Sequence, residues 1–285
     1  MINLPFKNSI LSSLLKQRIK QINIVNSSPL ITQEKTFKDL IKKALNTKFG
    51  NDHSFSKIKT YDEYKKNVPV RKYEEIFPYI DQMRMGKKNI LWPGKTTFFA
   101  KSSGTTNAKS KYIPLSNDTL YDCHFKGGKD MLAIYLNNNP ESRVFNGKGI
   151  MLGGSKTTND KIIEGDLSAI LLDNFPFWVN SHRIPDIETA LSDNWNKKLE
   201  KITEQSINQN ITNLTGVPSW MLILLSKIIK KTGVNNINDI WPNLELYMHG
   251  GVNIRPYKNQ FSRLIKNNNM NYLEAYNASE GFFAI

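Results

Sequence analysis

The chain has 285 residues, of which 39% are hydrophobic and 11% aromatic, enough to bury the core of one large or two modest domains. Its formal net charge of +14 raises nucleic acid or an anionic membrane as a partner, but the lysines and arginines are scattered and form no dense tract. This composition excludes a disordered chain and does not favour specific nucleic-acid binding.

Cysteine content and hydropathy bear on the compartment. Cys123 is the single cysteine, so no intramolecular disulfide can form, and a reducing cytoplasm is the expected location. The most apolar stretch, residues 220–229, is interrupted by Ser226 and Lys227 and is too short to cross a bilayer. Residues 1–33 lack Asp and Glu and resemble a transit peptide, but their apolar spacing also fits an amphipathic helix, which we favour.

Residues 1–95 are predicted to be mainly helical. Thr60 and Glu63 form a capping box that starts a short helix at Tyr61. Further helices are expected at residues 7–25, 37–50 and 73–83, the last interrupted by a proline. This segment shows no catalytic pattern, so we expect it to serve packing.

From residue 96 onward, short apolar strands alternate with amphipathic helices, which predicts an α/β fold with a largely parallel sheet. Glycine- or hydroxyl-rich turns follow five of the strands, after Lys101, Leu152, Leu214, Met248 and Ala275. Ligands of open α/β sheets bind outside the carboxyl ends of the strands, so we expect these turns to share one rim.

Two stretches of this part stay open. Residues 167–172 fit either a strand or a helix. The long helix that Ser116 caps contains Gly127 and Gly128, each costing roughly 1 kcal/mol relative to alanine. Either the helix breaks at this pair, or another helix or a ligand approaches it closely.

The loop between the first two strands has the composition of an anion site. It contains small hydroxyl residues around one glycine and then lysines: Ser102, Ser103, Gly104, Thr105, Thr106, Lys109 and Lys111. Backbone N–H groups of such a loop can converge on one point and, with the hydroxyls and a lysine, cradle a phosphate. The Gly-Lys-Ser/Thr ending of a Walker loop is absent, so an ordinary surface turn is the alternative.

This loop, followed by Ile113-Pro114, resembles the phosphate loop of the auxin-responsive acyl-acid amido synthetase family, within the acyl-adenylate-forming superfamily. Two further motifs agree and follow in order. Residues 249–253, His-Gly-Gly-Val-Asn, resemble the glycine turn on the adenine side. Residues 276–283, Tyr-Asn-Ala-Ser-Glu-Gly-Phe-Phe, resemble the family's Tyr-x-x-Ser/Thr-Glu-Gly motif. The N-terminal helices and residues 215–220 also look like those of bacterial members, so the resemblance covers essentially the whole chain.

The resemblance implies a fold and a reaction. Residues 1–285 would form the large domain of an adenylate-forming enzyme, with a helical segment over 1–95 and an α/β nucleotide-binding part over 96–285. A small carboxylic acid would attack the α-phosphorus of ATP to give an acyl-adenylate and pyrophosphate. An amine, such as an amino acid, would then displace AMP to give an amide. No protein nucleophile is needed, because positioning supplies most of the rate.

Site residues are implied in the same way. The hydroxyls and N–H groups of residues 102–106 would hold the ATP phosphates, with Lys109 or Lys111 in a catalytic role. Glu280 would act in catalysis by holding Mg²⁺, which neutralises phosphate charge. The remaining nucleotide-binding residues would be Gly250, Gly251, Val252, Tyr276, Asn277, Ala278 and Ser279. We assign no role to His249.

The chain departs from the family at its end. It stops at Ile285, directly after the third motif, where family members continue with a ribose-binding aspartate, a hinge and a small C-terminal domain. We therefore expect an incomplete large domain that lacks the small domain, binds nucleotide weakly and catalyses poorly.

Two alternatives remain. The acyl group could pass to a thiol, such as coenzyme A or a carrier, or the chain could be a non-enzymatic basic protein that binds nucleic acid. The acid, the amine and the oligomeric state are not specified by the sequence. Candidates for holding the substrate carboxylate are Lys126, Arg143 and Arg183, and residue 220 begins a helix that is a candidate lining of the acyl pocket.

Overall fold

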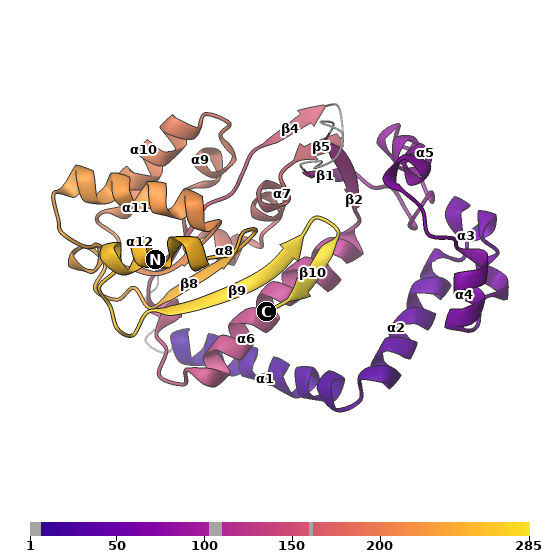
Figure 1. The fold of residues 1–285 in the computed structure, drawn as a ribbon, viewed down its shortest axis with the longest axis horizontal. Coiled ribbons are helices and arrows are strands. Elements are labelled where there is room, and N and C mark those ends of the chain that lie inside the picture. Colours follow the sequence, from indigo (N-terminus) through magenta and orange to yellow (C-terminus); the bar gives the residue numbers. More distant parts are fainter. Residues whose placement is uncertain (1–6, 103–109, 160–161) are drawn as a thin grey trace. The chain divides into compact units, whose positions relative to one another are not determined.

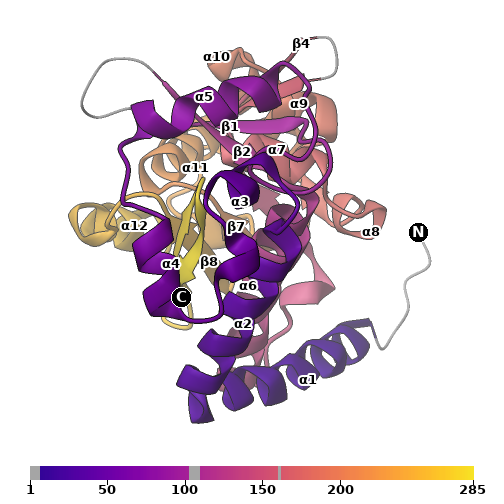
Figure 2. The same ribbon diagram turned by 90° about the vertical axis from the view of Figure 1, so that its right-hand side faces the viewer.

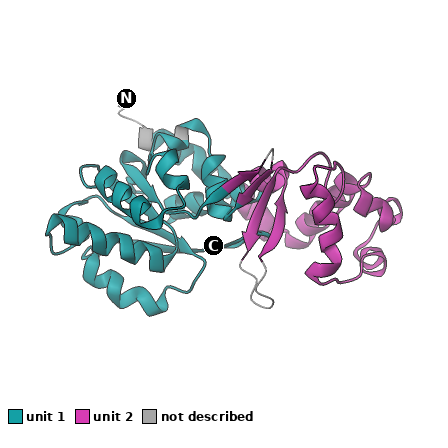
Figure 3. Ribbon diagram, turned by 90° about the horizontal axis from the view of Figure 1, so that it is seen from above, with its two compact units in different colours: residues 1–19, 123–156, 165–285 teal, residues 20–122, 157–164 magenta. Residues whose placement is uncertain are grey.

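Two sheets organise the chain, and each belongs to a separate compact unit (Figure 3). The computed structural model describes residues 7–102, 110–159 and 162–285. Unit 1 consists of residues 1–19, 123–156 and 165–285, and unit 2 consists of residues 20–122 and 157–164. The two units are interleaved along the sequence, because the chain passes from unit 1 into unit 2 twice.

Unit 1 contains a six-stranded sheet with the strand order β10-β9-β8-β7-β3-β6 (Figure 1). Neighbouring strands are parallel except for β10, which runs antiparallel to β9. The strands are β3 (Lys148–Met151), β6 (Arg183–Ile184), β7 (Ile211–Thr215), β8 (Leu246–Gly250), β9 (Asn271–Ala278) and β10 (Gly281–Ala284). The expected α/β fold with a largely parallel sheet is confirmed.

Helices cover both faces of this sheet, and β8 shows how. Tyr247 packs into the larger apolar cluster with α10, α11 and α12, whereas Leu246 and Met248 pack into a second cluster with α6. Alternate side chains of a strand point to opposite faces, so a central strand covered on both sides is apolar throughout. The helices of this unit are α6 (Phe125–Asn138), α7 (Leu167–Asp173), α8 (Phe177–Asn180), α9 (Ile187–Leu191), α10 (Trp195–Ser206), α11 (Pro218–Thr232) and α12 (Lys258–Leu264), with 3-10 turns η3 (Val144–Asn146), η4 (Ile237–Asp239) and η5 (Arg255–Tyr257).

Unit 2 combines helices with a four-stranded sheet of order β2-β1-β5-β4. Helix α5 (Tyr73–Arg84) lies on the hairpin of β1 (Phe98–Ser102) and β2 (Lys111–Leu115) (Figure 2). An apolar cluster that includes Ile80, Met83 and Phe99 packs the helix against the hairpin. The elements of unit 2 are α2 (Pro29–Ala44), α3 (Lys48–Asp52), η1 (Phe55–Lys57), α4 (Tyr61–Asn67), α5 (Tyr73–Arg84), β1 (Phe98–Ser102), β2 (Lys111–Leu115), β4 (Lys156–Asn159) and β5 (Ile162–Gly165). Two helical segments cross between the units, α1 (Lys7–Ser27) and the π-helical turn η2 (Thr119–His124).

The local helix signals were confirmed at the capping box and wrong at Pro78. The Thr60 hydroxyl accepts a hydrogen bond from the Glu63 N–H at 3.3 Å, and the Glu63 carboxylate accepts one from the Thr60 N–H at 3.0 Å, so the predicted capping box is present. The expected interruption at Pro78 is wrong: α5 continues to Arg84, although the proline, inside the helix, has no N–H to donate to the Glu74 carbonyl. The open stretch at residues 167–172 is helical.

Two expectations about strands were wrong, and two strands were missed. Strand β1 belongs to the four-stranded sheet, so it is not one of the strands of the parallel sheet. Residues 276–278 continue β9 rather than forming a turn, because they pair with β10. Strands β4 and β5 were not predicted at all, because β4 is short, polar and mostly exposed.

Candidate nucleotide-binding site

The second and third motifs lie side by side in unit 1. Strands β8 and β9 pair in parallel, with His249 opposite Glu274 and Gly250 opposite Ala275. The glycine turn therefore leaves the sheet beside the residue that precedes Tyr276. This edge is the carboxyl end of the parallel strands, where open α/β sheets bind ligands.

Both glycines of the turn meet a backbone requirement. A Cβ added at Gly250 would lie 2.3 Å from the carbonyl oxygen of Ala275, so the strands could not pair this closely with any other residue. Gly251 has φ of +81°, in the left-handed region that favours glycine. Strand packing and turn geometry thus account for the pair before any ligand is considered.

The third motif forms the tip of the β9–β10 hairpin. Ser279 and Glu280 are the turn residues between the two strands, and the Glu280 carboxylate is exposed. Tyr276 is 61% exposed, and its ring lies against Phe283 with centroids 5.1 Å apart. An exposed aromatic ring near a strand end is suited to stacking on a flat ring such as adenine.

Contacts with the end of η2, directly before α6, hold this hairpin in place. The His124 ring nitrogen Nδ1 donates a hydrogen bond to the Asn277 side-chain oxygen at 2.7 Å, and the Phe282 N–H donates to Cys123 Sγ at 3.2 Å. The His124 side chain is 2% exposed, and burial lowers its pKa, so the ring is neutral near pH 7. The side chain of Asn277, expected to bind nucleotide, is thus engaged by the protein.

Some of the unpaired buried polar atoms of the described residues lie near the same edge, and the others belong to Arg71 and Asn238. Among the described residues, Thr215 Oγ1, His124 Nε2 and His249 Nδ1 are buried without a hydrogen-bond partner. Thr215 ends β7 opposite Met248 of β8, and His249 is the next residue along β8. Such atoms are rare in folded proteins, and an internal water or a ligand group is their ordinary partner. The sequence predicted a strand that ends beside Thr215, which was the signal that this residue lies near the rim. Only the fold shows that its hydroxyl has no hydrogen-bond partner.

The first motif is carried by the β1–β2 hairpin of unit 2. Ser102 pairs with Lys111 and Lys101 pairs with Tyr112, so the loop begins and ends at the Ser102–Lys111 pair. The Lys111 ammonium lies 5.4 Å from the centre of the Tyr73 ring. The other predicted loop residues lie outside the described residues: Ser103, Gly104, Thr105, Thr106 and Lys109.

A magnesium ion at Glu280 would need a nucleotide to supply further ligands. Within residues 7–102, 110–159 and 162–285, no three His, Cys, Asp or Glu side chains form a group that could hold a metal ion. Mg²⁺ commonly binds through one or two carboxylates together with substrate phosphates and water. A single exposed carboxylate at a hairpin tip matches that mode. No helix in the described parts of the chain has the length and apolar character needed to cross a membrane.

Comparison with solved structures shows which known fold the chain adopts. The fold is that of the acyl acid amido synthetases: AtGH3.15 in complex with 2,4-DB superposes with a TM-score of 0.69 over 98% of this chain, at 15% sequence identity. A second GH3.15 structure superposes with a TM-score of 0.65 over 96% of this chain, at 14% identity. This chain spans 57% of the length of each.

The family follows from the sequence match. The model of the GH3 family N-terminal domain matches residues 18–270, so this chain belongs to the GH3 family. One relative, the 4-substituted benzoates-glutamate ligase GH3.12 of Arabidopsis thaliana, is 35% identical over an alignment that covers 25% of this chain and 16% of the relative. The resemblance drawn from the three motifs is confirmed.

Proposed function

We propose that this chain is the nucleotide-binding part of an ATP-dependent ligase that activates a small carboxylic acid as its acyl-adenylate and passes the acyl group to an amine. Membership in the GH3 family supports the reaction class. The name of the Arabidopsis relative, a benzoates-glutamate ligase, supports an amino acid as the amine. The observation that carries the proposal is the pairing of β8 with β9, which brings two of the three motifs to one sheet edge.

The residues of this chain would act by binding and orientation. A carboxylate and ATP are both anions, so the first step needs their repulsion offset. N–H groups and hydroxyls of residues 102–106, with Lys109 and Lys111, would hold the phosphates. The exposed ring of Tyr276 would stack on adenine beside Gly250 and Gly251. Glu280 would hold Mg²⁺, which when bound neutralises phosphate charge.

The test separates binding from turnover. Binding of Mg-ATP is measured by calorimetry, and adenylation by acid-dependent exchange of labelled pyrophosphate into ATP with a panel of carboxylic acids. Mass spectrometry after addition of amino acids or coenzyme A distinguishes an amide from a thioester. Acid-dependent exchange followed by an amide supports the proposal, and a thioester supports the alternative acceptor.

Two variants and one outcome bear on the nucleotide site itself. The substitutions Glu280→Gln and Ser103→Ala should each reduce the thermal stabilisation that Mg-ATP gives. Affinity for RNA or DNA that falls steeply with salt, with no stabilisation by Mg-ATP, would contradict the proposal and favour a nucleic-acid-binding protein.

A further inference from the structure

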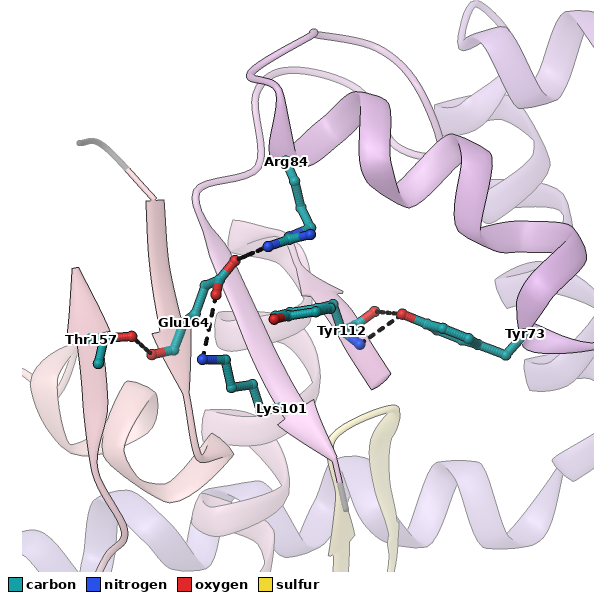
Figure 4. A network of polar contacts seen from close by, with 6 residues as sticks. All are labelled: Tyr73, Arg84, Lys101, Tyr112, Thr157 and Glu164. Atoms are coloured by element: carbon teal, nitrogen blue, oxygen red, sulfur yellow. Dashed lines mark hydrogen bonds and ion pairs between the residues drawn. The ribbon is translucent and has the colours of Figure 1, made fainter. Parts of the chain in front are cut away.

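A buried carboxylate joins the elements that flank the phosphate loop (Figure 4). Glu164 of β5 is 6% exposed, and its Oε1 accepts two hydrogen bonds from Arg84, from Nε at 3.0 Å and from Nη2 at 2.7 Å. Its Oε2 lies 3.5 Å from the Lys101 ammonium. Arg84 ends α5, and Lys101 stands one residue before the end of β1. One side chain thus ties α5 and β1 to the strand beside them.

The second side of the loop stem is held from the same helix. The guanidinium of Arg84 lies 3.9 Å from the centre of the Tyr112 ring, close enough for a cation–π contact. The Tyr73 hydroxyl accepts a hydrogen bond from the Tyr112 N–H at 2.7 Å and donates one to the Tyr112 carbonyl at 3.3 Å. Tyr112 pairs with Lys101 across the hairpin, so both residues of this pair contact Arg84 or its partner Glu164.

The charges show which contact is tight. A buried carboxylate is costly unless it is paired and hydrogen-bonded, and Arg84 meets that need with two short bonds to one oxygen. The contact with Lys101 is longer, and the Lys101 side chain is 35% exposed. Glu164 therefore fixes Arg84 firmly and Lys101 loosely, and the three groups carry a net charge of about +1 at the stem of a loop expected to bind anions.

We propose that Glu164 and Arg84 are positioning residues for the ATP phosphates. They touch no nucleotide themselves. They fix the two strands of the hairpin beside Ser102 and Lys111, so that these two expected phosphate ligands are held in place before ATP arrives. The inference rests on the proposed function, because it assumes that this loop binds the phosphates.

A role through charge alone and a role in positioning predict opposite changes in ATP affinity for one substitution. Glu164→Gln removes a negative charge near the loop. If Glu164 acted only through its charge, ATP would bind more tightly. If Glu164 positions the stem, ATP binds less tightly, because Arg84 and Lys101 are released. A loss of ATP affinity in this variant therefore cannot come from its charge alone.

The experiment compares dissociation constants for Mg-ATP and for adenosine, measured by calorimetry on the whole chain. We expect Glu164→Gln and Arg84→Lys to weaken ATP binding about tenfold, the change given by a loss of about 1.4 kcal/mol, and to leave adenosine binding within about twofold. Arg84→Lys keeps the charge but loses the two-bond geometry. Because it is the milder change, it also serves if Glu164→Gln does not fold.

The control variant breaks a similar arginine–carboxylate pair in unit 1. Arg18 donates to Asp130 from Nε at 2.5 Å and from Nη2 at 3.1 Å, within unit 1, so Asp130→Asn should lower stability and leave ATP affinity unchanged. Equal losses for ATP and adenosine, or unchanged or tighter ATP binding in Glu164→Gln and Arg84→Lys, would overturn the inference and leave the proposed function intact. A wild-type chain that does not bind ATP would overturn both.

Discussion

The ring of Phe282 lies directly on Gly127. A Cβ added at Gly127 would be 2.4 Å from Cγ of Phe282, whereas one added at Gly128 would meet nothing within 4 Å. Helix α6 does not break at this pair. The close approach left open by the sequence is therefore real at the first glycine, and the approaching group is the hairpin that carries the third motif.

The two glycines should respond to alanine in opposite ways. Gly128→Ala should raise the free energy of unfolding by roughly 0.5–1 kcal/mol, because alanine favours the helix. Gly127→Ala should lower it by about 1–3 kcal/mol, because the new methyl group displaces the Phe282 ring. Urea unfolding monitored by circular dichroism measures both. Equal stabilisation by both substitutions would show that Phe282 does not occupy this position.

Buried histidines should make stability depend on pH. Burial lowers the pKa of His124 and of His249 in the folded chain. The unfolded chain then binds protons at a higher pH than the folded chain. The free energy of unfolding is therefore at its full value above about pH 6.5 and decreases as the pH is lowered, until the lowered pKa values are reached. The slope is at most about 1.4 kcal/mol per pH unit for each histidine. In urea unfolding between about pH 7.5 and 5.5, His124→Asn should reduce this slope, and an unchanged slope would contradict a neutral buried ring.

Lys198 should contribute far more to the free energy of unfolding than Lys197, the lysine beside it. Its side chain is 2% exposed, and its ammonium donates to the carbonyl oxygens of Gly153 at 3.0 Å and Gly154 at 2.8 Å. Lys198→Met keeps the length of the side chain but leaves these acceptors unpaired, so we expect a loss of roughly 1–3 kcal/mol in unfolding free energy. The exposed Lys197→Met should change it by less than about 0.5 kcal/mol. Comparable effects of the two substitutions would argue against these bonds.

The Tyr276 ring should contribute equally to the affinity for adenosine and for ATP. Removal of a stacking ring costs about 1–3 kcal/mol per base, so Tyr276→Ala should weaken both ligands by the same factor, measured by calorimetry. Tyr272, four residues earlier on the same strand, is 40% exposed and is the matched control: Tyr272→Ala should leave both affinities unchanged. If only ATP were affected by Tyr276→Ala, the ring would not face the base.

Local patterns predicted local structure well, and contacts between distant residues explain the rest. The capping box of Thr60 and Glu63 needs only four residues, and it formed as predicted. Strand β4 could not be predicted, because its sequence Lys-Thr-Thr-Asn becomes a strand only by pairing within the sheet. The Asn277 side chain accepts its hydrogen bond from His124, which lies 153 residues earlier in the chain. The three motifs were evident in the sequence, whereas the side chains that hold them were not.

The same limit applies to the phosphate loop. Its hydroxyl and lysine composition is a local signal and could be recognised directly. Glu164, which lies 80 residues after Arg84, belongs to a strand that was not predicted, so nothing in the sequence connected the two. Residues that position a loop from neighbouring elements carry no motif of their own.

The measurement that tests the central claim most directly is the Mg²⁺ dependence of ATP binding, by calorimetry with and without Mg²⁺, in the wild-type chain, Glu280→Gln and Glu274→Gln. Glu280 lies at the hairpin tip, and Glu274 is an exposed carboxylate on the same hairpin. The account predicts that Mg²⁺ tightens ATP binding in the wild-type chain and in Glu274→Gln, and that Glu280→Gln loses this gain. Absence of ATP binding in the wild-type chain, or a full magnesium effect in Glu280→Gln, would contradict it.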